Sequence, residues 1–129
     1  MNTLCVLLVV DTAGALATGS LSGNCYMVDT NGYLGSWGEG TSELHTVCED
    51  AQTLVWSVEP VSPGAQVAIA GFSGPMVDQE VCRPAAGYDG SAAWSGVVES
   101  QGAFASYAYT ATLSLESTQL AIDCFIKVA

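Results

Sequence analysis

The chain has 129 residues, with 13 Asp and Glu against two basic residues and a formal net charge of −11. Half of its residues are hydrophobic and 12% are charged, a composition that excludes an intrinsically disordered chain. Phosphate backbones and anionic lipids are bound through Lys and Arg, so this charge excludes nucleic acid and membrane surfaces as partners.

The first predicted element is the apolar run at residues 4–10, which small residues follow as far as Ala17. A secretory signal is not indicated, because no Lys or Arg precedes the run and Asp11 ends it. The run is also far shorter than the roughly 20 residues that span a bilayer. We therefore predict a buried strand covered on both faces. Without a classical signal peptide we expect a cytoplasmic protein, with non-classical export as the alternative.

The middle of the chain contains several short segments of strand character. Asn31-Gly32 lies between the apolar segments 25–28 and 33–34 and predicts a tight hairpin. Pro60 and Pro63 are expected to end a strand. A turn or two at 75–81 is the one helix that we predict, because Pro75 suits a first helical position. The other candidate strands are residues 43–48, 53–59, 66–72 and 93–99.

The clearest alternation of apolar and polar residues lies at 105–115 and 119–128, which predicts a terminal antiparallel hairpin. Phe125 is the one apolar residue on its polar face. We expect a loop to cover it or a partner to bind it, which makes Phe125 a candidate oligomer contact. With about eight strands in all, we predict an all-β fold: one antiparallel β-sandwich domain over residues 1–129, Ig-like or jelly-roll-like.

Five cysteines, an odd number without a CxxC pair, lie among apolar or β-forming residues. This pattern favours reduced cysteines in the core over a disulfide framework. A bridge between two of them stays open as an alternative, because pairing depends on the separation of Cα atoms.

No motif predicts an enzyme. His45 is the sole histidine, so it would have to be the base for any serine or cysteine nucleophile. Residues 71–75, GFSGP, resemble a nucleophile elbow but have Pro75 in place of the final glycine. Residues 29–32, DTNG, resemble the start of a calcium loop, but the glycine comes too early and the hairpin explains them better. We predict no catalytic residue, no metal and no cofactor.

Aromatic and acidic residues in glycine-rich stretches give the candidate ligand site. Trp37 and Glu39 lie in one such stretch, and Asp89 and Trp94 lie in another. Indole rings stack on sugar C–H groups while carboxylates accept hydrogen bonds from hydroxyl groups, so these residues suit a carbohydrate. The alternative is that the tryptophans pack in the core or at a subunit contact.

Five segments in series resemble the AidA/PixA inclusion-body family of bacteria, and the AidA branch most closely. They are VLLVVDT (6–12), CYMV (25–28), GEGTSEL (38–44), LVWSV (54–58) and IDCFIKV (122–128). The resemblance runs through the whole chain, although Cys124 stands where members commonly have proline. It implies an accessory protein made at high cell density under quorum-sensing control, linked to host interaction in some relatives and to inclusions in others. It implies no enzymatic activity and no binding residues.

These observations predict a non-enzymatic, virulence-associated protein that forms homo-oligomers. The alternative is a lectin-like module, and a glycan or a host protein is the expected further partner. With a pI near 4.1, copies lose their mutual repulsion as the pH falls toward 4, so self-association is expected to increase there.

Overall fold

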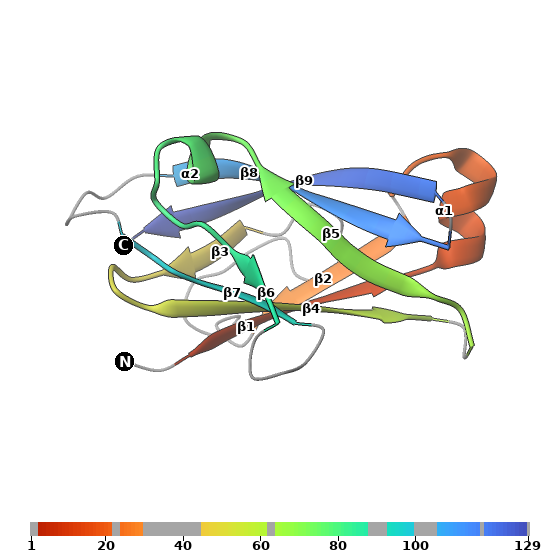
Figure 1. The fold of residues 1–129 in the computed structure, drawn as a ribbon, viewed down its shortest axis with the longest axis horizontal. Coiled ribbons are helices and arrows are strands. Elements are labelled where there is room, and N and C mark those ends of the chain that lie inside the picture. The colour runs from red at the N-terminus through yellow and green to blue at the C-terminus, as the bar shows by residue number, and fades with distance from the viewer. Residues whose placement is uncertain are drawn as a thin grey trace.

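The computed structural model describes residues 3–21, 24–29, 45–61, 64–87, 93–99, 106–116 and 118–128. These residues form nine strands and two short helices. The strands make two sheets that pack face to face, with the helix α1 (Thr12–Thr18) at one end of the molecule (Figure 1). The all-β sandwich expected from the sequence is confirmed.

The first sheet has five strands, and the N-terminal strand lies inside it. β1 pairs antiparallel with β2 on one side and parallel with β4 on the other. The strand order is β2 (Cys25–Asp29), β1 (Leu4–Val10), β4 (Thr53–Pro60), β7 (Trp94–Val97) and β6 (Ala85–Ala86).

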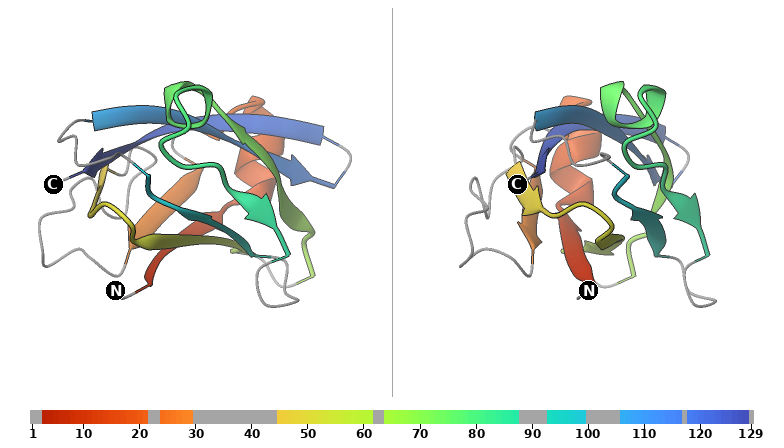
Figure 2. Two further views of the ribbon diagram at one scale, coloured as in Figure 1. Left: turned by 60° about the vertical axis from the view of Figure 1, so that its left-hand side comes forward. Right: turned by 90° about the vertical axis from the view of Figure 1, so that its left-hand side faces the viewer.

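The second sheet has four strands and contains the predicted terminal hairpin. β8 and β9 pair antiparallel from Ser106 with Lys127 to Leu115 with Thr118, as the alternation predicted. The strand order is β3 (His45–Cys48), β9 (Thr118–Val128), β8 (Ser106–Leu115) and β5 (Val67–Ser73). Figure 2 shows the two layers from the side, with β8 and β9 above and β1 and β4 below.

Two features of the sheets differ from the prediction. The pairs β1–β4 and β3–β9 are parallel, so both sheets are mixed rather than purely antiparallel. Only one face of β1 is fully buried: its even-numbered residues are buried, whereas Cys5 is exposed and Leu7 and Val9 are half-buried. The strand is apolar on both faces, but the second sheet covers only the inner one.

The helix α1, which follows β1 directly, was not among the predicted elements. The Asp11 carboxylate caps the helix by accepting a hydrogen bond of 3.2 Å from the Gly14 amide. Gly19 ends it with a left-handed φ of 70°. The small residues after the apolar run therefore form a short helix at the end of the sandwich, with Thr12 and Ala15 buried. In the described part of the chain, no helix is long and apolar enough to cross a membrane.

The predicted helical turn after Pro75 is confirmed in a shorter form as α2 (Pro75–Asp78). Gly74 precedes it with a φ of 100°. A Cβ atom at Gly74 would lie 3.3 Å from the Tyr109 Cα, so this turn packs closely on β8. Met76 is fully buried and anchors α2 on the sandwich.

The core lies between the sheets around an aromatic cluster, which we define as Trp56, Phe72, Trp94 and Tyr109. Trp56 is fully buried, and its indole Nε1 donates a hydrogen bond of 3.3 Å to the Tyr109 hydroxyl. The Phe72 ring lies 5.0 Å from that of Trp56 and 5.5 Å from that of Trp94. Edge and tilted contacts of this kind add to the stability gained from burial of the rings.

We predict that Gly74→Ala destabilises the fold more than Gly64→Ala does. Both glycines have positive φ, 100° and 84°, and Gly74, with a ψ of −175°, lies in a region that essentially only glycine adopts, so its substitution costs roughly 1–3 kcal/mol of backbone strain. Only at Gly74 does the new methyl also press on β8, since nothing lies within 4 Å of it at Gly64. Denaturant titration of both variants measures the difference, and equal losses would contradict the close approach to Tyr109.

Candidate functional site

The catalytic candidates are far apart, as the strand order shows. Ser73 ends β5 and His45 begins β3, and these are the two outermost strands of the second sheet. β8 and β9 lie between them, a backbone separation of roughly 14 Å. Ser73 and His45 therefore do not form a nucleophile–base pair. Among the described residues there is also no cluster of three His, Cys, Asp or Glu that would hold a metal ion.

Of the four residues that are predicted to bind a carbohydrate, the structure describes one. Trp94 lies in β7, where its half-buried ring packs against Phe72 in the aromatic cluster. This is the packing role that we weighed against sugar binding. Trp37, Glu39 and Asp89 lie outside the described residues, as does the predicted Asn31-Gly32 hairpin. The carbohydrate site stays a prediction.

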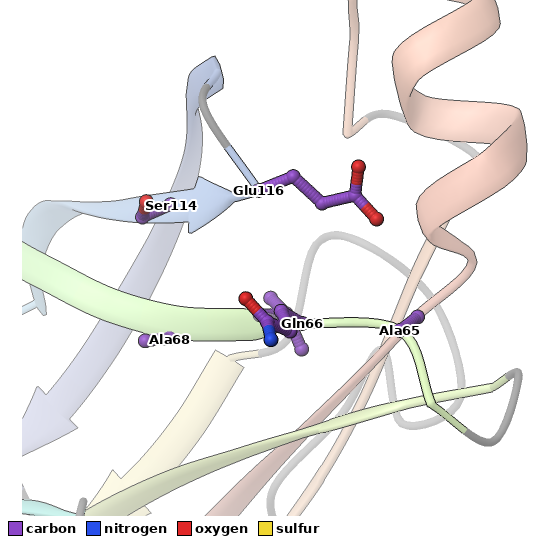
Figure 3. A pocket seen from close by; sticks show the side chains of 6 residues that line it. Ala65, Gln66, Ala68, Ser114 and Glu116 are labelled. Carbon is purple, nitrogen blue, oxygen red and sulfur yellow. The ribbon is translucent and has the colours of Figure 1, made fainter.

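A shallow pocket of about 280 Å³ lies where β5 begins and β8 ends. Figure 3 shows Ser114 and Glu116 on the side of β8, Ala65 and Gln66 on the segment that leads into β5, and Ala68 in β5 itself. The Glu116 amide donates a hydrogen bond of 3.2 Å to the Gln66 carbonyl, which holds the two segments together. A single carboxylate among small residues gives this pocket little chemistry of its own.

The more unusual feature is the outer face of the five-stranded sheet, the one turned away from the second sheet. Its rows follow from the register: Val9 lies between Tyr26 and Glu59, and Cys5 lies beside Val55. Most of its members are apolar; Tyr26 and Val97 at its corners are 45% and 44% exposed, whereas Val55 near its middle is 7% exposed. The positions of this "apolar face" are Cys5, Leu7, Val9, Tyr26, Val28, Thr53, Val55, Ser57, Glu59, Ala85, Ser95 and Val97.

Charge is almost absent from the apolar face. Among its described positions only Glu59 carries a charge, and it lies near the end of β4. Elsewhere the described surface is rich in carboxylates. Those that are exposed are Glu49, Asp78, Glu80, Glu99, Glu116 and Asp123.

The outer face of the four-stranded sheet has the opposite character. On β8 it carries mostly hydroxyl groups, and Thr110 donates a hydrogen bond of 2.6 Å to the Asp123 carboxylate on β9. Phe125 lies on this polar face, half-buried, in register with Ala108 on β8 and His45 on β3. Its predicted position on the wrong face is confirmed, whereas its role as an oligomer contact stays a prediction.

The cysteines divide between core and surface. None is in a disulfide, and Cys25, Cys48, Cys82 and Cys124 are buried as expected. Cys5 is the exception, exposed on the apolar face. Burial raises the pKa of each of the four inner thiols to about 12. These thiols are therefore protonated, unreactive packing groups at neutral pH, and the Cys124 Sγ lies 3.3 Å from the Met27 Sδ.

The family model described as "Domain of unknown function (DUF8788)" matches residues 2–121. The chain belongs to this family. Its fold is also similar to the crystal structure of the inclusion body protein PixA from Burkholderia cenocepacia, with a TM-score of 0.72 and 13% identity. The match covers 99% of this chain and 96% of PixA. No curated protein sequence matches the chain. The resemblance seen in the sequence is thus confirmed as a PixA-like fold.

We predict that one thiol of this DUF8788 protein reacts with Ellman's reagent under native conditions at pH 8. Cys5 is exposed, whereas the other four thiols are buried and protonated. The native protein should release about one equivalent of thionitrobenzoate, and the denatured protein five. Cys5→Ser should abolish the native reaction, and rapid modification of several native thiols would contradict the burial.

We predict that the protein also loses stability as the pH rises from 9 to 12. Each inner thiol has a pKa of about 12 when folded against an ordinary value of 9.0, so above pH 9 only the unfolded chain releases its proton. The free energy of unfolding then falls by roughly 1 kcal/mol per thiol and pH unit. Urea titrations from pH 7 to 11 measure this slope. Cys124→Ala should make it shallower; a flat profile would contradict the mechanism.

Proposed function

We propose that the protein is a non-enzymatic, self-associating accessory protein of the inclusion-body type. The apolar face carries this proposal: a chain of net charge −11 keeps one sheet face almost free of charge and leaves Tyr26 and Val97 exposed on it. Apolar patches of this kind are usually contact sites. The PixA-like fold supports the same conclusion, because that relative is described as an inclusion body protein.

The separation of the catalytic candidates supports a function without chemistry. Two strands, β8 and β9, separate Ser73 from His45, and the inner thiols are protonated. The resemblance to the AidA branch adds the biological setting that we propose: production under quorum-sensing control, accumulation in the cytoplasm at high cell density, and a role in virulence or host interaction.

Net charge is the proposed control on assembly. At neutral pH the copies repel each other through an excess of carboxylates that two basic residues cannot balance. As the pH falls toward the pI of about 4.1 the carboxylates are protonated, the repulsion vanishes and the apolar contact dominates.

We predict that solubility is at least tenfold lower near pH 4 than at pH 7 at equal ionic strength. The concentration left in the supernatant after centrifugation measures it. Circular dichroism, and recovery of the protein on return to pH 7, separate assembly of folded chains from acid unfolding. Glu49→Gln with Glu99→Gln removes two exposed carboxylates and should shift the precipitation to higher pH. Equal solubility at both pH values would contradict control by charge.

A further inference from the structure

We propose that the apolar face binds the apolar face of a second copy, so that two molecules stack in a two-fold symmetric dimer. This inference rests on the proposed self-association and names the surface that makes it. The four-stranded sheets, with their polar outer faces, would then lie on the two outer sides of the dimer.

The charge distribution indicates that the occupant is a copy of the chain. A cationic partner would be attracted to the carboxylates on the rest of the surface rather than to a face whose one described charge is Glu59. The natural partner of a neutral apolar surface is another neutral apolar surface. In a two-fold dimer the same patch serves both molecules, so self-complementarity requires only that this one face be free of charge.

The size of the face sets the strength of the contact. Each strand residue occupies roughly 16 Å² of a sheet, which gives the paired part of the five strands a flat area of about 400 Å². Two such faces bury an area at the low end of specific interfaces. The dimer is therefore weak and depends on concentration, which suits a protein that assembles only when it accumulates.

The exposed side chains mark the extent of the face. Tyr26 lies on the edge strand β2 beside Val9, whereas Val97 lies on β7 beside Thr53. Val9 lies near one end of the paired strands β1 and β4, and Thr53 lies at the other end. Tyr26 and Val97 therefore occupy diagonally opposite corners of the apolar face. Cys5 and Leu7 lie near the midpoint between them. A contact that needs both corners must cover the whole face.

Strand addition at a sheet edge is the competing arrangement. In the described part of the chain, the edge strands β3 and β6 are short and β5 carries a bulge between Ile69 and Gly71, which disfavours pairing there. β2 is the edge that remains. Tyr26 lies on β2 and would affect either arrangement, but Val97 lies three strands away and affects face stacking alone.

Sedimentation velocity over a concentration series at pH 7 tests the face with Tyr26→Glu and Val97→Glu, separately and together. We expect the dimer to weaken at least tenfold in each variant, because each dimer then buries two new carboxylates. Leu16→Glu is the matched control: its side chain is 38% exposed on the helix α1, outside the five-stranded sheet, and the net charge of this variant is the same. It should dimerise nearly as the unmodified chain does.

A complementation experiment tests whether the Glu variants lose the dimer because they misfold. The double variant Tyr26→Lys with Val97→Lys, mixed with the double variant Tyr26→Glu with Val97→Glu, should form a heterodimer, although the second variant alone stays monomeric. Cross-linking gives an independent readout. Across stacked sheets the two Cys5 residues lie within roughly 13 Å, so a short bismaleimide should join the native chains. Cys5→Ser should abolish the product.

The outcomes separate this inference from the proposed function. If the unmodified chain stays monomeric at all concentrations and down to pH 4, the proposed self-association fails, and the inference fails with it. If it dimerises but Val97→Glu has no effect, the face is overturned and self-association stands. Loss of the dimer in Tyr26→Glu alone would assign the contact to the β2 edge, and loss in Phe125→Glu alone would assign it to the polar face.

Discussion

The parallel pairing of β1 with β4 is the constraint on which the rest of the structure depends. It aligns the two strands from Leu4 and Leu54 to Val10 and Pro60. Because side chains alternate along a strand, the same register sets Val6 beside Trp56 in the interior and Cys5 beside Val55 outside. The inner row supports the aromatic cluster, and the outer row forms the middle of the apolar face. One backbone register therefore determines both the core and the candidate interaction surface.

The two outer faces differ because their strands follow different patterns. β8 alternates between buried apolar residues and outward hydroxyl groups such as that of Thr110, which donates a hydrogen bond to the Asp123 carboxylate. Its outer face is therefore hydrated without help from a partner. β1 is apolar at every position, so whichever face turns outward remains apolar. A sheet built around such a strand needs cover on its second face, and the described part of the chain leaves Cys5 on that face exposed.

Local patterns were sufficient to predict the β8–β9 hairpin, the end of β4 at Pro60 and the turn after Pro75. They were not sufficient for the parallel pairings, because alternation tells which way a residue faces but not which strand lies beside it. α1 was missed because its small residues have no strong helical pattern, although Asp11 and Gly19 are a recognisable pair of caps. Leu7 and Val9 could have indicated the apolar face from the sequence. We did not predict it, because we expected the strand at residues 4–10 to be covered on both faces.

In the self-association that we propose for so acidic a chain, charge and apolar surface act at different ranges. At physiological ionic strength repulsion between copies is screened beyond about 8 Å, whereas an apolar contact gains free energy only when two surfaces touch and expel water. Net charge therefore governs how often copies meet, and the apolar face governs how long they stay together. Because the face carries almost none of the charge, protonating carboxylates elsewhere leaves the contact itself unchanged. The low content of charged residues and the apolar strand β1 are then parts of one arrangement.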